Sequence, residues 1–206
     1  MREVMRWDYK TKDGHVVGHV IRLESDNKAK GSKSRKQIIP HFKENGQSGI
    51  PQGLPAQHRI YGMDTVQNTN EPVYVVEGEK CAFALHGLGY QAVTSIGGCA
   101  QVQLADWSFL REAKTVYLLP DYDQTGAGYM QTVYEALKRA VKEKGAVMPT
   151  VQIVAFKDKP KADICDFFKA QSGMDGWNEL ECLQGHPLKD ALKERFKGYT
   201  AQNAAP

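Results

Sequence analysis

The stretch Val73-Tyr-Val-Val-Glu77-Gly-Glu-Lys80 begins with a short apolar run, continues with acidic residues around a glycine, and passes into a helix-like pattern. The same layout returns in Tyr117-Leu-Leu-Pro-Asp121-Tyr-Asp123-Gln-Thr-Gly126. Each apolar run predicts a buried strand that ends at an acid, and each following segment predicts a helix. In an open α/β sheet, strand ends of this kind form the crevice where ligands bind.

Three carboxylates, those of Glu77, Asp121 and Asp123, are expected to face one small space at these strand ends. Residues i and i+2 of an extended segment point the same way, which places the two aspartates on one side. Like charges this close need cations, and a site made of oxygen atoms suits Mg²⁺ or Mn²⁺. Each motif alone also has a simpler interpretation, because acidic residues commonly cap or stabilise the start of a helix. Of the two glutamates, Glu77 is predicted to be functional and Glu79 to stabilise the helix start.

The bulk properties describe an ordinary globular chain. Its 206 residues suffice for one domain, or for one domain with an appendage. The sequence has no apolar run near the ~20 residues that span a bilayer, and its start lacks the apolar core of a signal peptide. A cytoplasmic location without membrane contact is therefore expected. The net charge of +3 says little about nucleic acid by itself.

The four cysteines give no sign of a metal or disulfide framework. They are not arranged as C-x-x-C, and no histidine stands at zinc-finger spacing from them. In a cytosolic chain they are expected to be reduced and mostly buried thiols.

The first sixty residues predict a small antiparallel β lobe. Residues 5–10 and 16–23 are partly alternating runs with Asp13-Gly14 between them, which is a strong hairpin signal. The basic, glycine- and serine-rich segment 28–36 predicts a loop. Residues 37–40 are expected to form a third strand ended by proline. Residues 43–57 predict an irregular connection.

From about residue 60 the pattern alternates between strands and helices. Strands are expected at 73–76, 91–95, 116–119 and 151–155, and helices at 79–88, 102–110 and 126–143. This alternation predicts an α/β fold with a parallel sheet and right-handed crossovers. A short helix is expected at 162–169, begun near Asp163, followed by helices at 175–184 and 188–197 and a disordered tail at 200–206. The expected division is a basic β-rich lobe at 1–60, an α/β domain at 61–170, and helices with a tail at 171–206.

The two acidic motifs together resemble the Toprim domain, the catalytic module shared by DnaG-type bacterial and phage primases, topoisomerases and some nucleases. That family's pattern is an apolar strand ending in Glu-Gly and a later one ending in Asp-x-Asp-x-x-Gly. The resemblance covers roughly residues 60 to 170 and looks closest to primase relatives from phages and plasmids. Arg59-Ile-Tyr61-Gly62 also looks like the lead-in of that group. A Toprim-like parallel sheet flanked by helices, with a small N-terminal antiparallel β lobe, is the fold that this resemblance implies.

The resemblance implies metal-dependent phosphoryl or nucleotidyl transfer. Glu77, Asp121 and Asp123 would be the catalytic and metal-linked residues, and two cations would stabilise an in-line displacement. Asp163 is the candidate for a further acidic ligand, although it also suits the N-cap of the next helix. Many primase relatives carry an acid where this chain has Cys81, which is expected to pack the helix.

Contacts with substrate are expected on two further groups of residues. One is the basic segment, which would follow a nucleic-acid backbone without reading bases, or would simply be a solvated loop. Its members are Lys28, Lys30, Lys33, Arg35, Lys36 and Lys43. The other group would approach a nucleotide and consists of Gly78, Lys80, Gly97 and Gly98, of which the last two equally suit a loop turn.

The function that follows is primer synthesis by a primase-like nucleotidyltransferase in DNA replication of a phage or other mobile element. Single-stranded DNA and nucleoside triphosphates would be its substrates, and a replicative helicase or another replication protein its partner. Two alternatives stay open: a Toprim nuclease that uses the same carboxylates, and a module that binds DNA or a replication protein without turnover. The sequence shows neither a zinc-binding module nor a Gly-x-x-x-x-Gly-Lys-Ser/Thr helicase loop, so it is expected to be a fragment or a stand-alone protein.

Overall fold

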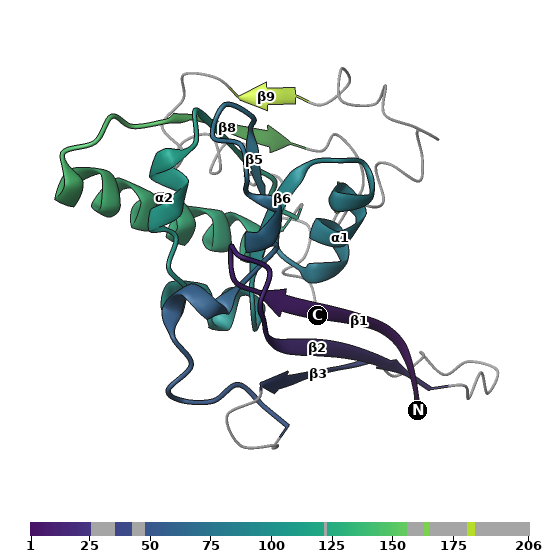
Figure 1. The fold of residues 1–206 in the computed structure, drawn as a ribbon. Coiled ribbons are helices and arrows are strands. Elements are labelled where there is room, and N and C mark those ends of the chain that lie inside the picture. Colours follow the sequence, from purple (N-terminus) through teal and green to yellow (C-terminus); the bar gives the residue numbers. More distant parts are fainter. Residues whose placement is uncertain (26–35, 43–47, 122, 156–162, 165–180, 184–206) are drawn as a thin grey trace.

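A computed structural model describes residues 1–25, 36–42, 48–121, 123–155, 163–164 and 181–183 of the chain. It has an α/β fold with two sheets, a small antiparallel one at the N-terminus and a larger mixed one (Figure 1). Both predicted parts, the antiparallel lobe and the parallel sheet flanked by helices, are confirmed.

The N-terminal sheet consists of β1 (Arg2–Lys10), β2 (Val16–Glu24) and β3 (Lys36–Phe42), paired antiparallel in that order. The predicted hairpin turn joins β1 to β2, with Gly14 in the left-handed region at φ +83°. Along β1, Trp7 and Tyr9 are buried while Arg6 faces solvent, which is the alternation expected of a sheet with one covered face.

Proline 40 does not end the third strand, contrary to the prediction, but lies within it. Pro40 faces Val20 of β2, and its carbonyl accepts the N–H of Gly49 on the side away from β2. The nitrogen of a strand residue points to the same side as its carbonyl, so the missing N–H removes no bond to β2. Because β3 is an edge strand, proline is tolerated there.

The larger sheet has the strand order β4-β6-β5-β7-β8-β9. The strands are β4 (Ile60–Tyr61), β5 (Val73–Val75), β6 (Gln91–Ser95), β7 (Thr115–Leu118), β8 (Thr150–Ala155) and β9 (Glu181–Leu183). The central four, β6, β5, β7 and β8, pair in parallel, while β4 and β9 are antiparallel additions at the two edges.

Two of these strands were not predicted. The short β4 carries too few residues to show a periodic signal. Residues 181–183 were expected within a helix, and that prediction is wrong: they pair with β8, so the open edge of a sheet overrides the local helical pattern. The remaining residues of the helices predicted at 175–184 and 188–197, and the tail at 200–206, lie outside the described residues.

Two α-helices occur in the described part of the chain, α1 (Glu79–Gly87) and α2 (Gln124–Lys144), close to their predicted ranges. Gly145 ends α2 in the left-handed conformation at φ +59°, the usual role of glycine after a helix. Short 3₁₀ turns make up much of the rest. They are η1 (Ala56–Arg59), η2 (Met63–Thr65), η3 (Gly98–Ala100), η4 (Val102–Leu104) and η5 (Ser108–Glu112).

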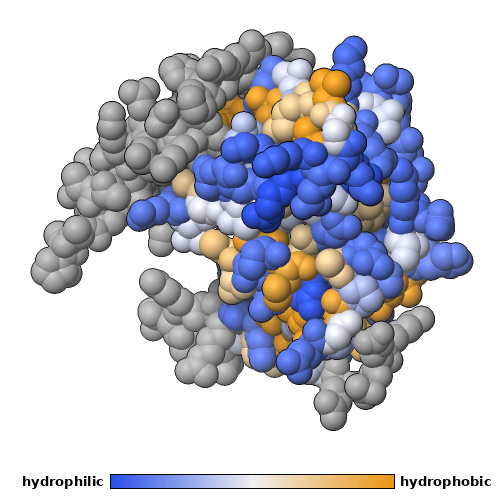
Figure 2. Space-filling view, turned by 90° about the vertical axis from the view of Figure 1, so that its left-hand side faces the viewer, coloured by the Kyte–Doolittle hydropathy of each residue, from blue (hydrophilic) through white to orange (hydrophobic). Residues whose placement is uncertain are grey.

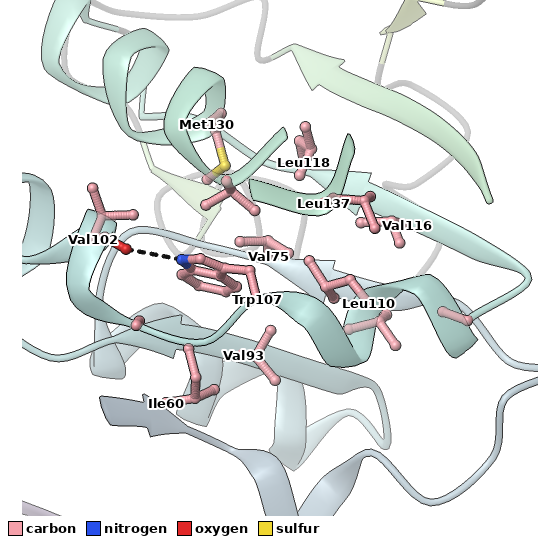
Figure 3. Packing of buried hydrophobic residues seen from close by; sticks show 14 of the residues in the cluster. Ile60, Val75, Val93, Val102, Trp107, Leu110, Val116, Leu118, Met130 and Leu137 are labelled. Atoms are coloured by element: carbon pink, nitrogen blue, oxygen red, sulfur yellow. Dashed lines mark hydrogen bonds between the residues drawn. The ribbon is translucent and has the colours of Figure 1, made fainter. Parts of the chain in front are cut away.

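The helix predicted at 102–110 is replaced by η4 and η5. A regular α-helix would bond the N–H of Asp106 to the carbonyl of Val102. Here the Asp106 N–H donates to the carbonyl of Ala56 at 3.1 Å, and the Val102 carbonyl accepts the Nε1–H of buried Trp107 at 2.9 Å (Figure 3). Tertiary contacts therefore take both groups, and the helix is interrupted.

The hydrophobic core lies on both faces of the larger sheet. On one face, Val75 and Val116 of the strands pack with Trp107 and with Met130 and Leu137 of α2 (Figure 3). On the other face, residues of α1 and of the N-terminal sheet share a second cluster that includes Tyr9, Val20, Phe42, Ala82 and Leu85. The N-terminal sheet is thus packed against the same face as α1 (Figure 1).

The side of the molecule from which the C-terminal end of α2 projects is largely hydrophilic, with separate hydrophobic patches (Figure 2). Among the described residues, no helix combines the length and the apolar character needed to cross a membrane.

Candidate functional site

The carboxyl ends of β5 and β7 lie next to each other, because the two strands pair in parallel with Val75 opposite Leu118. The residues that follow each strand are therefore neighbours. Glu77 Oε1 accepts the backbone N–H of Asp121 at 2.6 Å, although the two residues are 44 positions apart in the sequence. The predicted approach of the Glu-Gly motif to the Asp-x-Asp motif is present in the structure.

Asp123 is the N-cap of α2. Its Oδ1 accepts the N–H of Gly126 at 2.8 Å, which satisfies one of the free donors of the first helical turn. The simpler interpretation of this aspartate as a cap is thus correct. It does not exclude a second role, because a carboxylate has two oxygens that can each accept or coordinate.

Gly126 makes close contact between the two motifs possible. A Cβ atom added there would overlap Glu77 Oε1 and would lie 2.5 Å from the carbonyl oxygen of Asp121. The glycine of the Asp-x-Asp-x-x-Gly pattern therefore serves to admit the glutamate to the start of α2, not to supply an unusual backbone conformation.

Burial and the neighbouring carboxylates disfavour the ionised form of Glu77. Burial raises the pKa of Glu77 from its ordinary 4.5 to about 8, and the charges of Asp121 and Asp123 add to the increase. The hydrogen bond from the Asp121 N–H acts in the opposite direction but does not cancel it. A nearby cation would lower this pKa, since opposite charge favours the ionised form.

The carboxylates fit a divalent cation by their chemistry. All are hard oxygen donors, and Mg²⁺ commonly uses one or two carboxylates and keeps several waters. Within the described ranges, no group of three or more His, Cys, Asp or Glu side chains is arranged to hold a metal ion. One oxygen each of Glu77 and Asp123 is turned to a backbone N–H instead.

Asp163 lies near the start of α1. Its Oδ2 forms an ion pair with the Nζ of Lys80 at 3.0 Å, and both side chains are partly exposed. The structure thus pairs two residues that had been assigned separate roles, one toward metal and one toward nucleotide. Of the helix predicted at 162–169, only Asp163 and Ile164 are described, and of these two Ile164 is helical.

The glycines assigned to nucleotide contact differ from one another. Gly97 and Gly98 both have positive φ, +73° and +56°, so they form the turn from β6 into η3. Gly78 is extended at φ −151°, a conformation that any residue adopts, and among the described residues nothing lies within 4 Å of a Cβ placed there. Gly78 therefore leaves open space at the turn between Glu77 and α1.

Most of the predicted basic segment lies outside the described residues. This holds for Lys28, Lys30, Lys33 and Arg35, and for Lys43. Lys36 is exposed at the first position of β3, opposite Glu24. Of the cysteines, Cys81 is buried, as predicted, whereas Cys99 is exposed.

Two contacts near the site were not predicted. The hydroxyl of fully buried Tyr9 donates to Glu79 Oε1 at 2.8 Å. The hydroxyl of buried Tyr129 accepts the N–H of Ser95 at 2.8 Å, and burial raises its pKa to about 12. Neither follows from spacing in the sequence, although a tyrosine on the apolar face of the predicted helix 126–143 indicates a buried hydroxyl that needs a partner.

Comparisons with known proteins agree with the fold. Residues 74–163 match the model of a protein family described as Toprim-like. No curated protein sequence matches the chain.

Solved primase structures share the fold. A DNA primase domain from Pseudomonas aeruginosa is 18% identical at a TM-score of 0.53, with 93% of this chain and 50% of that chain covered. The Aquifex aeolicus primase, comprising zinc-binding and RNA polymerase domains, is 16% identical at a TM-score of 0.51, with 96% and 47% covered. The chain thus spans about half the length of these two structures, and at such identities the likeness concerns the fold.

Proposed function

We propose that this protein, whose residues 74–163 match a Toprim-like family model, is a metal-dependent nucleotidyltransferase that synthesises primers in DNA replication. The observation that carries the proposal is the joining of the two acidic motifs, with Glu77 Oε1 2.6 Å from the Asp121 nitrogen. A carboxylate cluster with no cation would cost stability through like-charge repulsion, which supports a use for it.

Glu77, Asp121 and Asp123 are the residues proposed to hold Mg²⁺ or Mn²⁺. When bound, a divalent ion would polarise a phosphoryl oxygen and stabilise the charge of the displacement. Asp163 is proposed as a further acidic ligand. Because its carboxylate is paired with Lys80, this role requires the ion pair to open or to be shared.

Glu77 is also the proposed acid–base group. With its pKa raised to about 8, its carboxyl group holds a proton near neutral pH in the absence of a cation. A group whose pKa lies close to the working pH both accepts and releases a proton readily, which is the property required of a general acid–base catalyst. Because a bound cation would lower this pKa, the acid–base role requires that Glu77 does not coordinate the metal at that step.

Substrate contacts are proposed for the groups assigned from the sequence. The basic residues Lys28, Lys30, Lys33, Arg35, Lys36 and Lys43 would contact the backbone of single-stranded DNA. Gly78, with open space beside it, and the turn of Gly97 and Gly98 would admit a nucleoside triphosphate, with Lys80 at its phosphates. A replicative helicase or another replication protein is the proposed partner, and a phage or mobile element the proposed source.

One assay tests the reaction. The chain is incubated with single-stranded DNA, labelled nucleoside triphosphates and Mg²⁺ or Mn²⁺, and elongation and cleavage are scored on the same gel. Product that requires triphosphates supports primer synthesis. Cleavage without triphosphates would instead identify a nuclease. DNA binding that survives in the Glu77→Gln/Asp121→Asn double variant, with no turnover in the wild type, would identify a binding module.

A matched variant controls for loss of an aspartate as such. Asp106 accepts the N–H of Ser108 at 2.9 Å, in the manner of Asp123 at α2, but stands outside the carboxylate group. We expect Asp106→Asn to keep turnover and Asp123→Asn to lose it. Equal turnover in both would remove Asp123 from the site.

A further inference from the structure

A buried hydrogen bond joins the N-terminal sheet to the turn that carries Glu77. The Tyr9 side chain, from β1, is fully buried, and its hydroxyl donates to Glu79 Oε1 at 2.8 Å. Glu79 is the first residue of α1 and stands two positions after Glu77. A buried tyrosine hydroxyl needs a partner, so this bond fixes where the two parts of the molecule meet.

The Glu79 carboxylate stands at the point where the backbone enters α1. The N-cap, Gly78, has no side chain with which to cap the helix, and its carbonyl accepts the N–H groups of Cys81 at 3.0 Å and Ala82 at 3.2 Å. The hydrogen bond from Tyr9 therefore holds the first residue of the helix, next to Gly78.

Tyr9 is itself held firmly. Its ring packs against the rings of Phe42 and Tyr61, each with centroids 5.5 Å apart. The next residue, Lys10, forms an ion pair with Asp64 of η2 at 3.1 Å. The end of β1 is thus placed by packing and charge, and its hydroxyl is a fixed point for Glu79.

Glu77 lies between two anchors. On one side β5 holds it in the sheet, and on the other side Gly78 leads to Glu79. In the part of the chain that the structure describes, nothing lies close to the position of a Gly78 side chain, so packing at that residue does not hold the turn. Glu77 is therefore placed by β5 on one side and, through Gly78, by the start of α1 and its first residue Glu79 on the other.

We propose that Tyr9, acting through Glu79, is a positioning residue that sets the Glu77 carboxylate against Asp121. Its effect on turnover rests on the proposed function, but its effect on geometry does not. The backbone N–H of Asp121 donates to Glu77 Oε1, so the exchange rate of this one amide reports whether Glu77 is in place.

The test compares Tyr9→Phe with the wild type in the full chain, by hydrogen exchange of the Asp121 amide measured by NMR. The variant keeps the ring and loses the donor. Because one hydrogen bond contributes roughly a fivefold to tenfold change in an equilibrium, the Asp121 amide is expected to exchange about fivefold to tenfold faster. Turnover in the gel assay is expected to fall by a similar factor through kcat, with KM for the nucleotide unchanged.

Three further single variants and one double variant separate positioning from general loss of stability. Tyr61→Phe removes a hydroxyl from the same aromatic cluster, and within the described ranges that hydroxyl makes no hydrogen bond, so it is expected to change nothing at Asp121. Glu79→Gln keeps an oxygen that accepts from Tyr9 and is expected to stay close to the wild type. Glu79→Ala is expected to match Tyr9→Phe and to add nothing to it in the double variant.

The outcomes are distinguishable. Unchanged exchange at Asp121 in Tyr9→Phe, or additive effects of Tyr9→Phe and Glu79→Ala, would overturn the positioning role whatever the activity. Faster exchange in a chain whose wild type shows no turnover would support the positioning role and would count against the proposed reaction alone.

Discussion

The apolar face of α2 and the first turn of the same helix lie in different surroundings. Along its length, Met130 and Leu137 pack with Trp107 in a core whose polar groups are satisfied, as in the bond from Trp107 to the Val102 carbonyl. At its first turn, Gly126 and Asp123 meet Glu77, whose pKa burial and neighbouring charges raise to about 8. The same helix thus gains stability from its apolar face and from its Asp123 cap, while the Glu77 carboxyl group beside its start is disfavoured in the ionised form.

From this contrast we expect the core to determine stability and the carboxylate group to determine activity. The core holds α2 rigidly against β5 and β7, and that rigidity lets the carboxylates stay close together despite their repulsion. If this is correct, substitutions in the core will lower stability, whereas substitutions in the carboxylate group will spare or raise stability and remove activity.

The largest effect is expected from Trp107→Ala. Trp107 is buried at 1% exposure between the 3₁₀ turns and α2, and removal of a buried aromatic side chain costs about 3–5 kcal/mol. The free energy of unfolding in urea is expected to fall by this amount. Trp107→Phe keeps most of the volume and should lose much less. A small loss in Trp107→Ala would show that the core does not hold α2.

Asp121→Asn is expected to act in the opposite way. Removing its charge relieves Glu77 and should raise the metal-free thermal midpoint, while the loss of a proposed metal ligand should lower kcat on the order of a hundredfold or more. Circular dichroism and the gel assay measure the two effects on one preparation. Full activity in this variant would contradict the assignment of the site.

Gly126→Ala and Gly128→Ala form a matched pair on one helix. A Cβ at Gly126 overlaps Glu77 Oε1, and forced repacking of this kind costs about 1–3 kcal/mol. At exposed Gly128 a Cβ meets nothing within 4 Å among the described residues, so alanine should stabilise the helix by up to about 1 kcal/mol. If urea unfolding shows that both substitutions change the free energy of unfolding in the same direction, Gly126 is not in close contact with Glu77.

The sequence predicted the ends of β5 and β7 well because two local signals coincide there. An apolar run that stops at an acid marks both the strand and its exposed end, so the approach of Glu77 to Asp121 followed from parallel pairing alone. The helix α2 was equally clear, since its apolar period and the glycine after it agree.

Other elements could not be predicted because distant contacts decide them. The segment 102–110 has a helical pattern, but the Asp106 N–H is taken by Ala56 and the Val102 carbonyl by Trp107. The bond from Tyr9 to Glu79 joins residues 70 positions apart. Local pattern carries no information on such pairs, so Glu79 was interpreted from its helix position alone.

The pH dependence of stability without metal tests the contrast at Glu77, the residue beside the start of α2 whose pKa is raised. The pKa of Glu77 is about 8 when folded, against an ordinary value of 4.5. Between these values the native state keeps a proton that the unfolded state has released, so stability falls as pH rises, with a slope of up to about 1.4 kcal/mol per pH unit.

The slope from this group should vanish in Glu77→Gln, which has no proton to release, and should shrink with Mg²⁺ present, because a bound cation favours the ionised form. Urea unfolding from pH 5 to pH 8 measures the slope in each case. Wild type and Glu77→Gln with parallel stability profiles would mean that Glu77 ionises without penalty. The ionised Glu77 carboxylate would then be tolerated at the start of α2 without loss of stability. Repulsion among the carboxylates would no longer be a reason to infer a bound cation.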